Sequence, residues 1–283
     1  MTDQEFVELA NNTHLGYIVT GNDSVDRVTA AGLKGLSRYL LDKTAVNAMP
    51  LAEGGKQPEM TQEIGVKAIN IETDDLSLFP MIYWAVDPGQ AMLSDDAIRK
   101  LNEYRQHGGM LFIDTRDKTT ANQGKVMMGR VSARAKEIGL PFPGLMLAKP
   151  CDVDPNDVAD LTKVSGECHV LARSFYMLRD FEGRFDNGFY ERLQVYVEKA
   201  DEFRHDGVTT LIVGGNEWAA AWAVNEDGSN MFDVEAGNGN PPAKQRDMAK
   251  WFGVNAVMVA LTGNYKNDQV HAPALLKQMG AEP

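Results

Sequence analysis

Three apolar runs in this chain stop abruptly at polar, turn-forming clusters, and this pattern constrains the fold more than any other feature. Residues 18–20, 111–113 and 211–213 are followed by Gly21-Asn22-Asp23, Asp114-Thr115-Arg116-Asp117 and Gly214-Gly215-Asn216-Glu217. Buried parallel strands form continuous apolar runs, and open α/β sheets bind ligands outside the carboxyl ends of their strands. The sequence therefore predicts an α/β fold whose polar strand ends share one crevice.

Helical periodicity between the apolar runs predicts crossover helices. After a first strand over residues 15–20, Asn22, Asp23 and Ser24 supply capping side chains for a helix, on which Gly32 is expected to allow close approach to the sheet. Residues 66–71 and 79–86 predict an exposed and a buried strand, and Ser94 caps the next helix. Strands alternating with helices over short turns predict a doubly wound, mostly parallel sheet with helices on both faces.

The second half of the chain is less regular. A helix is predicted over residues 126–138, within an irregular insertion at about 118–168 that we expect over one edge of the sheet. Strands follow at 193–198 and 210–213, and a last helix at about 243–261 is expected to end in a cap at Gly263 and Asn264. Asn255 lies in the apolar stripe of that helix and must find buried partners. We predict one α/β domain over residues 1–283.

Charge and composition exclude several partners. The formal charge of −12 argues against nucleic acid, which requires a basic patch, and against docking on anionic lipid. The first five residues are acidic where a signal peptide is basic, and no apolar run approaches a membrane span, so we expect neither a signal peptide nor membrane insertion. The two cysteines, Cys151 and Cys168, imply no disulfide framework and suit a reducing, cytoplasmic compartment or indifference to redox state.

The polar strand ends supply the candidate site residues. For a small polar ligand we expect a site lined by Asn22, Asp114, Arg116, Asn216, Glu217 and His271. Asp114 or Asp117, with His271 or His169, are weak candidates for an acid–base pair. The five histidines show no metal-ligand spacing, so neither a metal nor another cofactor is expected. Arg173, Arg179 and Arg184 either hold an anionic ligand or pair with nearby acids.

Several ordered blocks together resemble a bacterial family. They are Thr20-Gly21-Asn22, Phe79-Pro80-Met81-Ile82-Tyr83-Trp84, residues 108–117, residues 174–185, Ala219-Ala220-Ala221-Trp222-Ala223-Val224, Gly253-Val254-Asn255 and residues 263–271. The family is the domain of unknown function found at the C-terminus of membrane-anchored proteins whose N-terminal region is of the aerotolerance-operon type, and the resemblance covers about residues 14–279. It implies tethering to a membrane by segments absent from this chain.

That family is similar to the class I glutamine amidotransferase-like superfamily, which implies a flavodoxin-like fold. In its catalytic members, the strand after a Gly-Gly turn ends in an elbow that carries a cysteine nucleophile. Here Ile113-Asp114-Thr115-Arg116 fills that place, and neither Cys151 nor Cys168 matches it. The resemblance therefore does not imply the glutaminase reaction, which needs an activated thiolate.

Three functional hypotheses follow from these features. The first is a non-catalytic amidotransferase-like module that binds a small polar ligand or a partner protein at the carboxyl edge of the sheet. The second is a hydrolase or amidase that uses an aspartate and a histidine. The third is a scaffold domain. An enzyme requires a carboxylate and a histidine that converge in a pocket, a binding module requires the pocket without that pair, and a scaffold requires neither.

Overall fold

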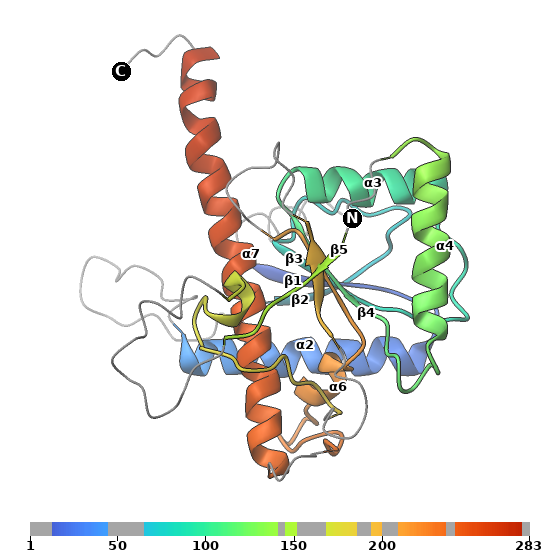
Figure 1. Ribbon diagram of the computed structural model, residues 1–283, viewed down its shortest axis with the longest axis vertical. Helices are drawn as coiled ribbons and strands as arrows, with labels where there is room; N and C mark the ends of the chain where they lie inside the picture. The colour runs from blue at the N-terminus through green and yellow to red at the C-terminus, as the bar shows by residue number, and fades with distance from the viewer. Residues whose placement is uncertain are drawn as a thin grey trace, which may run out of the picture.

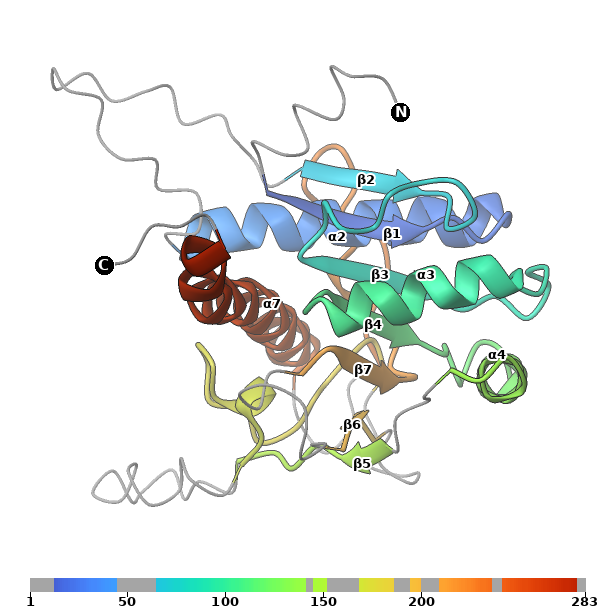
Figure 2. The same ribbon diagram turned by 90° about the horizontal axis from the view of Figure 1, so that it is seen from above.

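The computed structural model describes residues 13–44, 65–140, 145–151, 168–185, 194–199, 209–235 and 241–278, with only the backbone described from 263 onward. These residues form a mixed α/β fold (Figures 1 and 2). Its strands are β1 (His14–Ile18), β2 (Gly65–Ile69), β3 (Met81–Ala85), β4 (Met110–Asp114), β5 (Leu145–Leu147), β6 (Tyr196–Glu198) and β7 (Leu211–Gly214). Its helices are α2 (Asp23–Lys43), α3 (Asp95–Gln106), α4 (Gln123–Glu137), α6 (Trp218–Trp222) and α7 (Pro242–Gln278), with a 3₁₀ turn η2 (Val170–Ala172).

The seven strands form one sheet in the order β2-β1-β3-β4-β7-β6-β5. Neighbours from β2 to β7 pair in parallel, whereas β6 is antiparallel to both β7 and β5. The parallel strands therefore bring the ends of β1, β3, β4 and β7 to the same edge. The predicted strands of the first half are confirmed, including the more exposed β2, which lies at the edge of the sheet.

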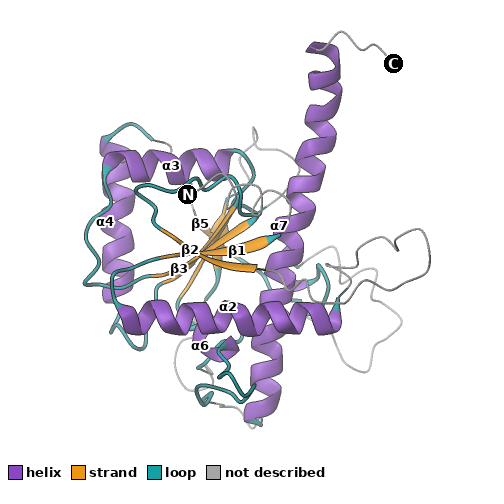
Figure 3. Ribbon diagram, turned by 180° about the vertical axis from the view of Figure 1, so that it is seen from behind, coloured by secondary structure: helices purple, strands orange, loops and turns teal. Residues whose placement is uncertain are grey.

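Helices lie on both sides of the sheet (Figure 3). The side chains of the strands alternate between two cores, one on each face of the sheet. In the fully buried strand β3, Tyr83 packs in the core under α2, α6 and α7, and its neighbour Trp84 packs in the core under α3 and α4. The first core is strongly aromatic, since Phe112 makes edge contacts with Trp218, Trp222 and Phe252. Because successive side chains enter opposite cores, β3 and β4 are buried throughout, and β4 is apolar up to its last residue, Asp114.

Helix α2 begins as the sequence predicts, but its glycine has another partner. Asn22 is the N-cap, and its side chain accepts a hydrogen bond from the Ser24 amide at 3.1 Å. Gly32 approaches α6 and not the sheet, because a Cβ atom at this position would lie 2.2 Å from the backbone oxygen of Ala219. The expectation that Gly32 lies against the sheet is therefore wrong. The short helix α6 packs against α2 at Gly32, where a side chain would clash with it.

Helix α7 is much longer than predicted. The sequence indicated an end near Leu261 with a cap at Gly263 and Asn264, but the helix continues to Gln278 (Figure 1). One glycine lowers helix stability by only about 1 kcal/mol, so it does not by itself end a helix.

Asn255 of α7 is fully buried, and its side chain makes four hydrogen bonds to three residues, as a buried amide requires. Its side-chain oxygen accepts from the amides of Phe175 and Tyr176 at 3.1 and 2.7 Å. Its side-chain nitrogen donates to the carbonyls of Leu171 and Tyr176 at 2.8 and 2.7 Å. The prediction of a partnered asparagine is confirmed, and its role is to attach the segment after η2 to α7.

The two cysteines contradict the expectation from composition. Cys151 and Cys168 form a disulfide with a Cα–Cα distance of 4.9 Å across a sequence separation of 17 residues. Both are buried in the core beneath α7. The sequence alone does not show that these two cysteines pair, because pairing depends on how the segment after β5 and the segment before η2 meet in space.

Candidate functional site

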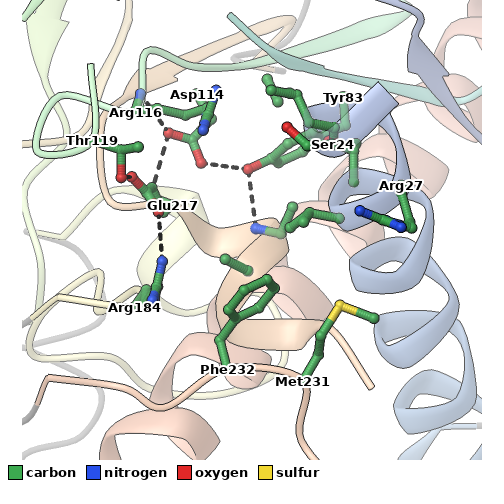
Figure 4. Close-up of a pocket in the computed structure, with 16 residues that line it drawn as sticks. Ser24, Arg27, Tyr83, Asp114, Arg116, Thr119, Arg184, Glu217, Met231 and Phe232 are labelled. Atoms are coloured by element: carbon green, nitrogen blue, oxygen red, sulfur yellow. Dashed lines mark hydrogen bonds and ion pairs between the residues drawn. The ribbon is translucent and has the colours of Figure 1, made fainter. Parts of the chain in front are cut away.

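A cavity of about 520 Å³ opens at the carboxyl edge of the sheet (Figure 4). Its walls are the first turns of α2, the ends of β3 and β4, the short helix α6 and the segment that follows α6. The volume lies in the range of small-molecule sites, and open α/β sheets place their ligands at this edge. Of the residues predicted to form the site, Asp114, Arg116 and Glu217 line this cavity.

Asp114 is the most buried of the three, with 1% of its surface exposed. Its carboxylate accepts the Tyr83 hydroxyl at 2.5 Å and the backbone amides of Arg116, Trp218 and Glu217 at 3.0, 3.0 and 3.3 Å. One side chain thus binds the turn after β4, the start of α6 and the aromatic core together. This bonding pattern is that of a structural cap.

Burial sets the protonation of this group. Desolvation, with a smaller contribution from the negative charge of Glu217, raises the pKa of Asp114 to about 7, against the lowering effect of the Tyr83 hydrogen bond. Burial and the neighbouring Asp114 raise the pKa of Tyr83 well above its ordinary value. Tyr83 therefore remains a phenol that donates to Asp114 and accepts from the Ala219 amide at 3.1 Å.

Glu217 occupies the turn between β7 and α6 with an unusual backbone. Its φ of 53° lies in the left-handed region, which is unfavourable for a residue with a Cβ atom. Its buried carboxylate accepts a hydrogen bond from the Thr119 hydroxyl and pairs with Arg184 at 3.2 Å. Strained backbone of this kind persists where the surroundings enforce it, often at functional sites.

Three arginines line the cavity. Arg116 also has a left-handed backbone, with φ of 52°, and its guanidinium lies 3.9 Å from Asp87. Arg184 is held over the ring of Phe232 at 4.9 Å and donates to the Asp233 carbonyl at 3.3 Å. Arg27 lies on the α2 wall across the cavity from the other two (Figure 4), and within the described residues it has no hydrogen bond or ion pair.

The other predicted residues support the site without lining it. Asn22 caps α2 and donates to Asp87 at 2.9 Å. Asp117 accepts the Thr115 hydroxyl at 2.7 Å and pairs with Lys125 at 2.8 Å. Asn216 is fully buried and donates to the Phe181 carbonyl at 2.8 Å. Their polar groups are directed at the protein, which is the structural role that such turn residues often have.

No histidine of the described part of the chain lines the cavity. His169 lies at η2 beside Thr209, where burial lowers its pKa, and the His271 side chain lies outside the described residues. The acid–base pair proposed from the sequence is therefore not formed by Asp114 or Asp117 with His169. Cys151 and Cys168 are joined in their disulfide and do not line the cavity either.

Sequence reasoning missed several residues of the cavity wall. Arg184 was anticipated as an anion-binding candidate, but Ser24, Arg27, Thr119, Met231 and Phe232 were not. Ser24 and Arg27 follow the first strand, so the rule that selected Asn22 could have included them. Nothing in the spacing of Met231 and Phe232 indicates that the chain returns from α6 to the cavity.

The fold and cavity define a class: an α/β domain with a ligand-sized pocket at the carboxyl edge of its sheet. The chain belongs to the family described as Domain of unknown function (DUF4159), which it matches over residues 14–146 and 157–261. No curated protein matches the sequence. Among the helices of the described residues, none combines the length and the apolar character that crossing a bilayer requires. The same residues contain no cluster of three or more side chains suited to a metal ion.

Proposed function

We propose that this domain is a non-catalytic module that binds a small polar ligand in the pocket at the carboxyl edge. The observation that carries the proposal is the cavity of about 520 Å³ between α2 and α6, lined by Asp114, Arg116 and Glu217 but by no histidine of the described residues. A pocket whose described residues form no carboxylate–histidine pair favours binding over hydrolysis, and a pocket of this size favours binding over a scaffold.

The strand order supports a finer relationship. The order β2-β1-β3-β4-β7 follows the flavodoxin-like 2-1-3-4-5 arrangement, in which the ligand lies near the switch between β1 and β3. We therefore propose a doubly wound domain of the class I glutamine amidotransferase-like superfamily. Because Asp114 stands where that superfamily has its elbow and makes four protein hydrogen bonds, the comparison favours a retained fold without the cysteine reaction.

A thermal-shift screen with a library of small polar metabolites tests the binding function. We expect at least one compound to raise the melting temperature of the full chain. Val28→Trp, on the α2 wall, should abolish this shift because the indole fills the cavity. Val126→Trp is the matched control, since Val126 lies on α4, is 58% exposed and does not line the cavity. Hits that persist in Val28→Trp, or a screen without hits, would contradict the proposed function.

For cellular context, we propose a membrane-associated parent protein whose domain faces an oxidising compartment. The Cys151–Cys168 disulfide supports the oxidising compartment, because disulfides persist mainly outside the reducing cytosol. The membrane-associated parent protein rests on the family resemblance alone. The chain, isolated from its native cells and alkylated under denaturing conditions without reductant, should take up no label at either cysteine. Two labels per chain would favour the cytoplasmic alternative.

A further inference from the structure

We infer that the ligand of this pocket is an organic anion, with a carboxylate or phosphate group that meets the arginines and an apolar body that packs against the apolar side chains of the wall. The inference rests on the proposed function and specifies the chemistry of its ligand. Arg27, Arg116 and Arg184 line the cavity against two acids, Asp114 and Glu217, in a chain whose formal charge is −12. A positively charged cavity in an acidic protein attracts anions selectively.

The two acids of the cavity are already occupied by donors of the protein. Asp114 accepts from the Tyr83 hydroxyl and three backbone amides, and its pKa of about 7 leaves part of the population neutral at physiological pH. Both oxygens of Glu217 have partners, Thr119 on one and Arg184 on the other. A cationic ligand would therefore find few free acceptors and would meet three guanidinium groups.

The guanidinium groups, by contrast, keep donors free. Arg27 has no bonding partner within the described residues, and the Arg116 guanidinium has only the 3.9 Å approach to Asp87. Arg184 uses Nη1 for Glu217 and Nε for the Asp233 carbonyl, so Nη2 makes no bond among the described residues. A guanidinium presents five donors in a planar fork that fits carboxylate and phosphate oxygens, and Phe232 and Glu217 hold the Arg184 fork in position.

One part of the wall is apolar. Ala219 and Ala220 of α6 line the cavity. Met231 and Phe232, from the segment after α6, lie between Arg184 and Arg27 (Figure 4). These side chains offer no partner to a purely polar ion such as phosphate. They favour a ligand whose charged group continues into a hydrocarbon or aromatic body.

Three matched probes test the charge requirement by titration calorimetry at constant ionic strength: sodium benzoate, its neutral amide benzamide, and phenyl phosphate. We expect benzoate or phenyl phosphate to bind and benzamide not to bind, and the tighter of the two anions identifies the preferred group. Benzamide that binds as tightly as benzoate would overturn the inference. Absence of binding by both anions at 20 mM, a concentration of the order at which weak fragments bind, would also overturn it.

Arginine variants then assign the binding to this pocket. Arg27→Ala should weaken anion binding about tenfold, a change of about 1.4 kcal/mol. Arg184→Gln should weaken it at least as much. Arg130→Ala is the control, because Arg130 is an exposed arginine of α4 that does not line the cavity. Equal affinities for Arg27→Ala, Arg184→Gln and Arg130→Ala would contradict the inference.

The outcomes separate this inference from the function on which it rests. If a neutral compound binds, and Val28→Trp abolishes that binding while Arg27→Ala does not, the pocket binds ligands but not by charge. If Val28→Trp leaves every binding event unchanged, the pocket itself is not the site, and the proposed function fails.

Discussion

The turns after β4 and β7 begin alike and use their carboxylates differently. Each contains a non-glycine residue in the left-handed region, Arg116 with φ of 52° and Glu217 with φ of 53°. A buried acid lines the cavity at each, Asp114 as the last residue of β4 and Glu217 within the turn after β7. Asp114 accepts backbone amides from both turns. Glu217 accepts only side-chain groups, from Thr119 and Arg184.

This difference separates structural support from pocket wall. Asp114 lies where the turns meet, so its removal would release the start of α6 and the loop after β4 together. Glu217 fixes Arg184 and Thr119, both of which line the cavity. One acid therefore maintains the edge of the sheet, and the other positions side chains that a ligand would touch.

The largest expected effect is the loss of Asp114. Asp114→Ala should lower the free energy of unfolding by about 4 kcal/mol, because four donors, including the buried Tyr83 hydroxyl, lose their acceptor. Urea unfolding measures this change. Asp117→Ala is a matched control: Asp117 is also buried but accepts only the Thr115 hydroxyl and pairs with Lys125, so we expect about 1 to 2 kcal/mol. Equal losses in the two variants would show that Asp114 is not a structural support.

Asn255 tests whether four hydrogen bonds of a neutral side chain stabilise the fold as much as those of Asp114. It also makes four hydrogen bonds in the core, but it is neutral and does not line the cavity. Asn255→Leu should lower the free energy of unfolding by about 3 kcal/mol, since two amides and two carbonyls lose their partner. Ligand affinity measured below the unfolding transition should not change. An unchanged thermal midpoint would mean that the segment after η2 does not depend on Asn255.

These two residues also illustrate what the sequence can predict. Asp114, Arg116 and Glu217 were placed together because parallel strands bring their carboxyl ends to one edge. Asn255 was recognised because helical periodicity placed an amide in an apolar stripe. In both cases a local pattern is sufficient, since the strand or helix itself determines where the side chain goes.

The parts that were not predicted depend on contacts between distant segments. Gly32 faces Ala219 of α6, 187 positions later, and no local signal shows that this five-residue helix lies against α2. The Cys151–Cys168 disulfide and the position of Phe232 in the cavity wall also depend on contacts between segments that are distant in sequence. Such features require the tertiary arrangement, because residue spacing says nothing about which segments meet.

The pH dependence of stability tests the burial of Asp114, the acid that supports the edge of the sheet. The pKa of Asp114 is about 7 in the folded chain, raised from its ordinary value of 3.8, which we take for the unfolded chain. The folded state therefore keeps a proton that the unfolded state releases, so stability falls as pH rises from about 4 to 7. Between pH 6 and 8 we expect this group to lower the free energy of unfolding by about 1.4 kcal/mol.

Urea unfolding of the parent chain and Asp114→Asn at both pH values measures this contribution. The slope assigned to Asp114 should be absent from the variant, whereas other groups such as His169 contribute equally to both and cancel. Identical pH slopes would show that Asp114 does not titrate in this window.

The smallest expected effect concerns the strained backbone at Arg116. Arg116→Gly removes the Cβ atom that makes φ of 52° unfavourable, whereas Arg116→Ala keeps that atom and removes the same guanidinium. The glycine variant should therefore be more stable than the alanine variant by about 1 kcal/mol in urea unfolding, and both should bind benzoate more weakly than the parent chain. A glycine variant that is less stable than the alanine variant would mean that this turn is not strained. If the expected order holds, the chain retains at this turn a residue that lowers its stability, and the value of Arg116 must come from its guanidinium in the cavity.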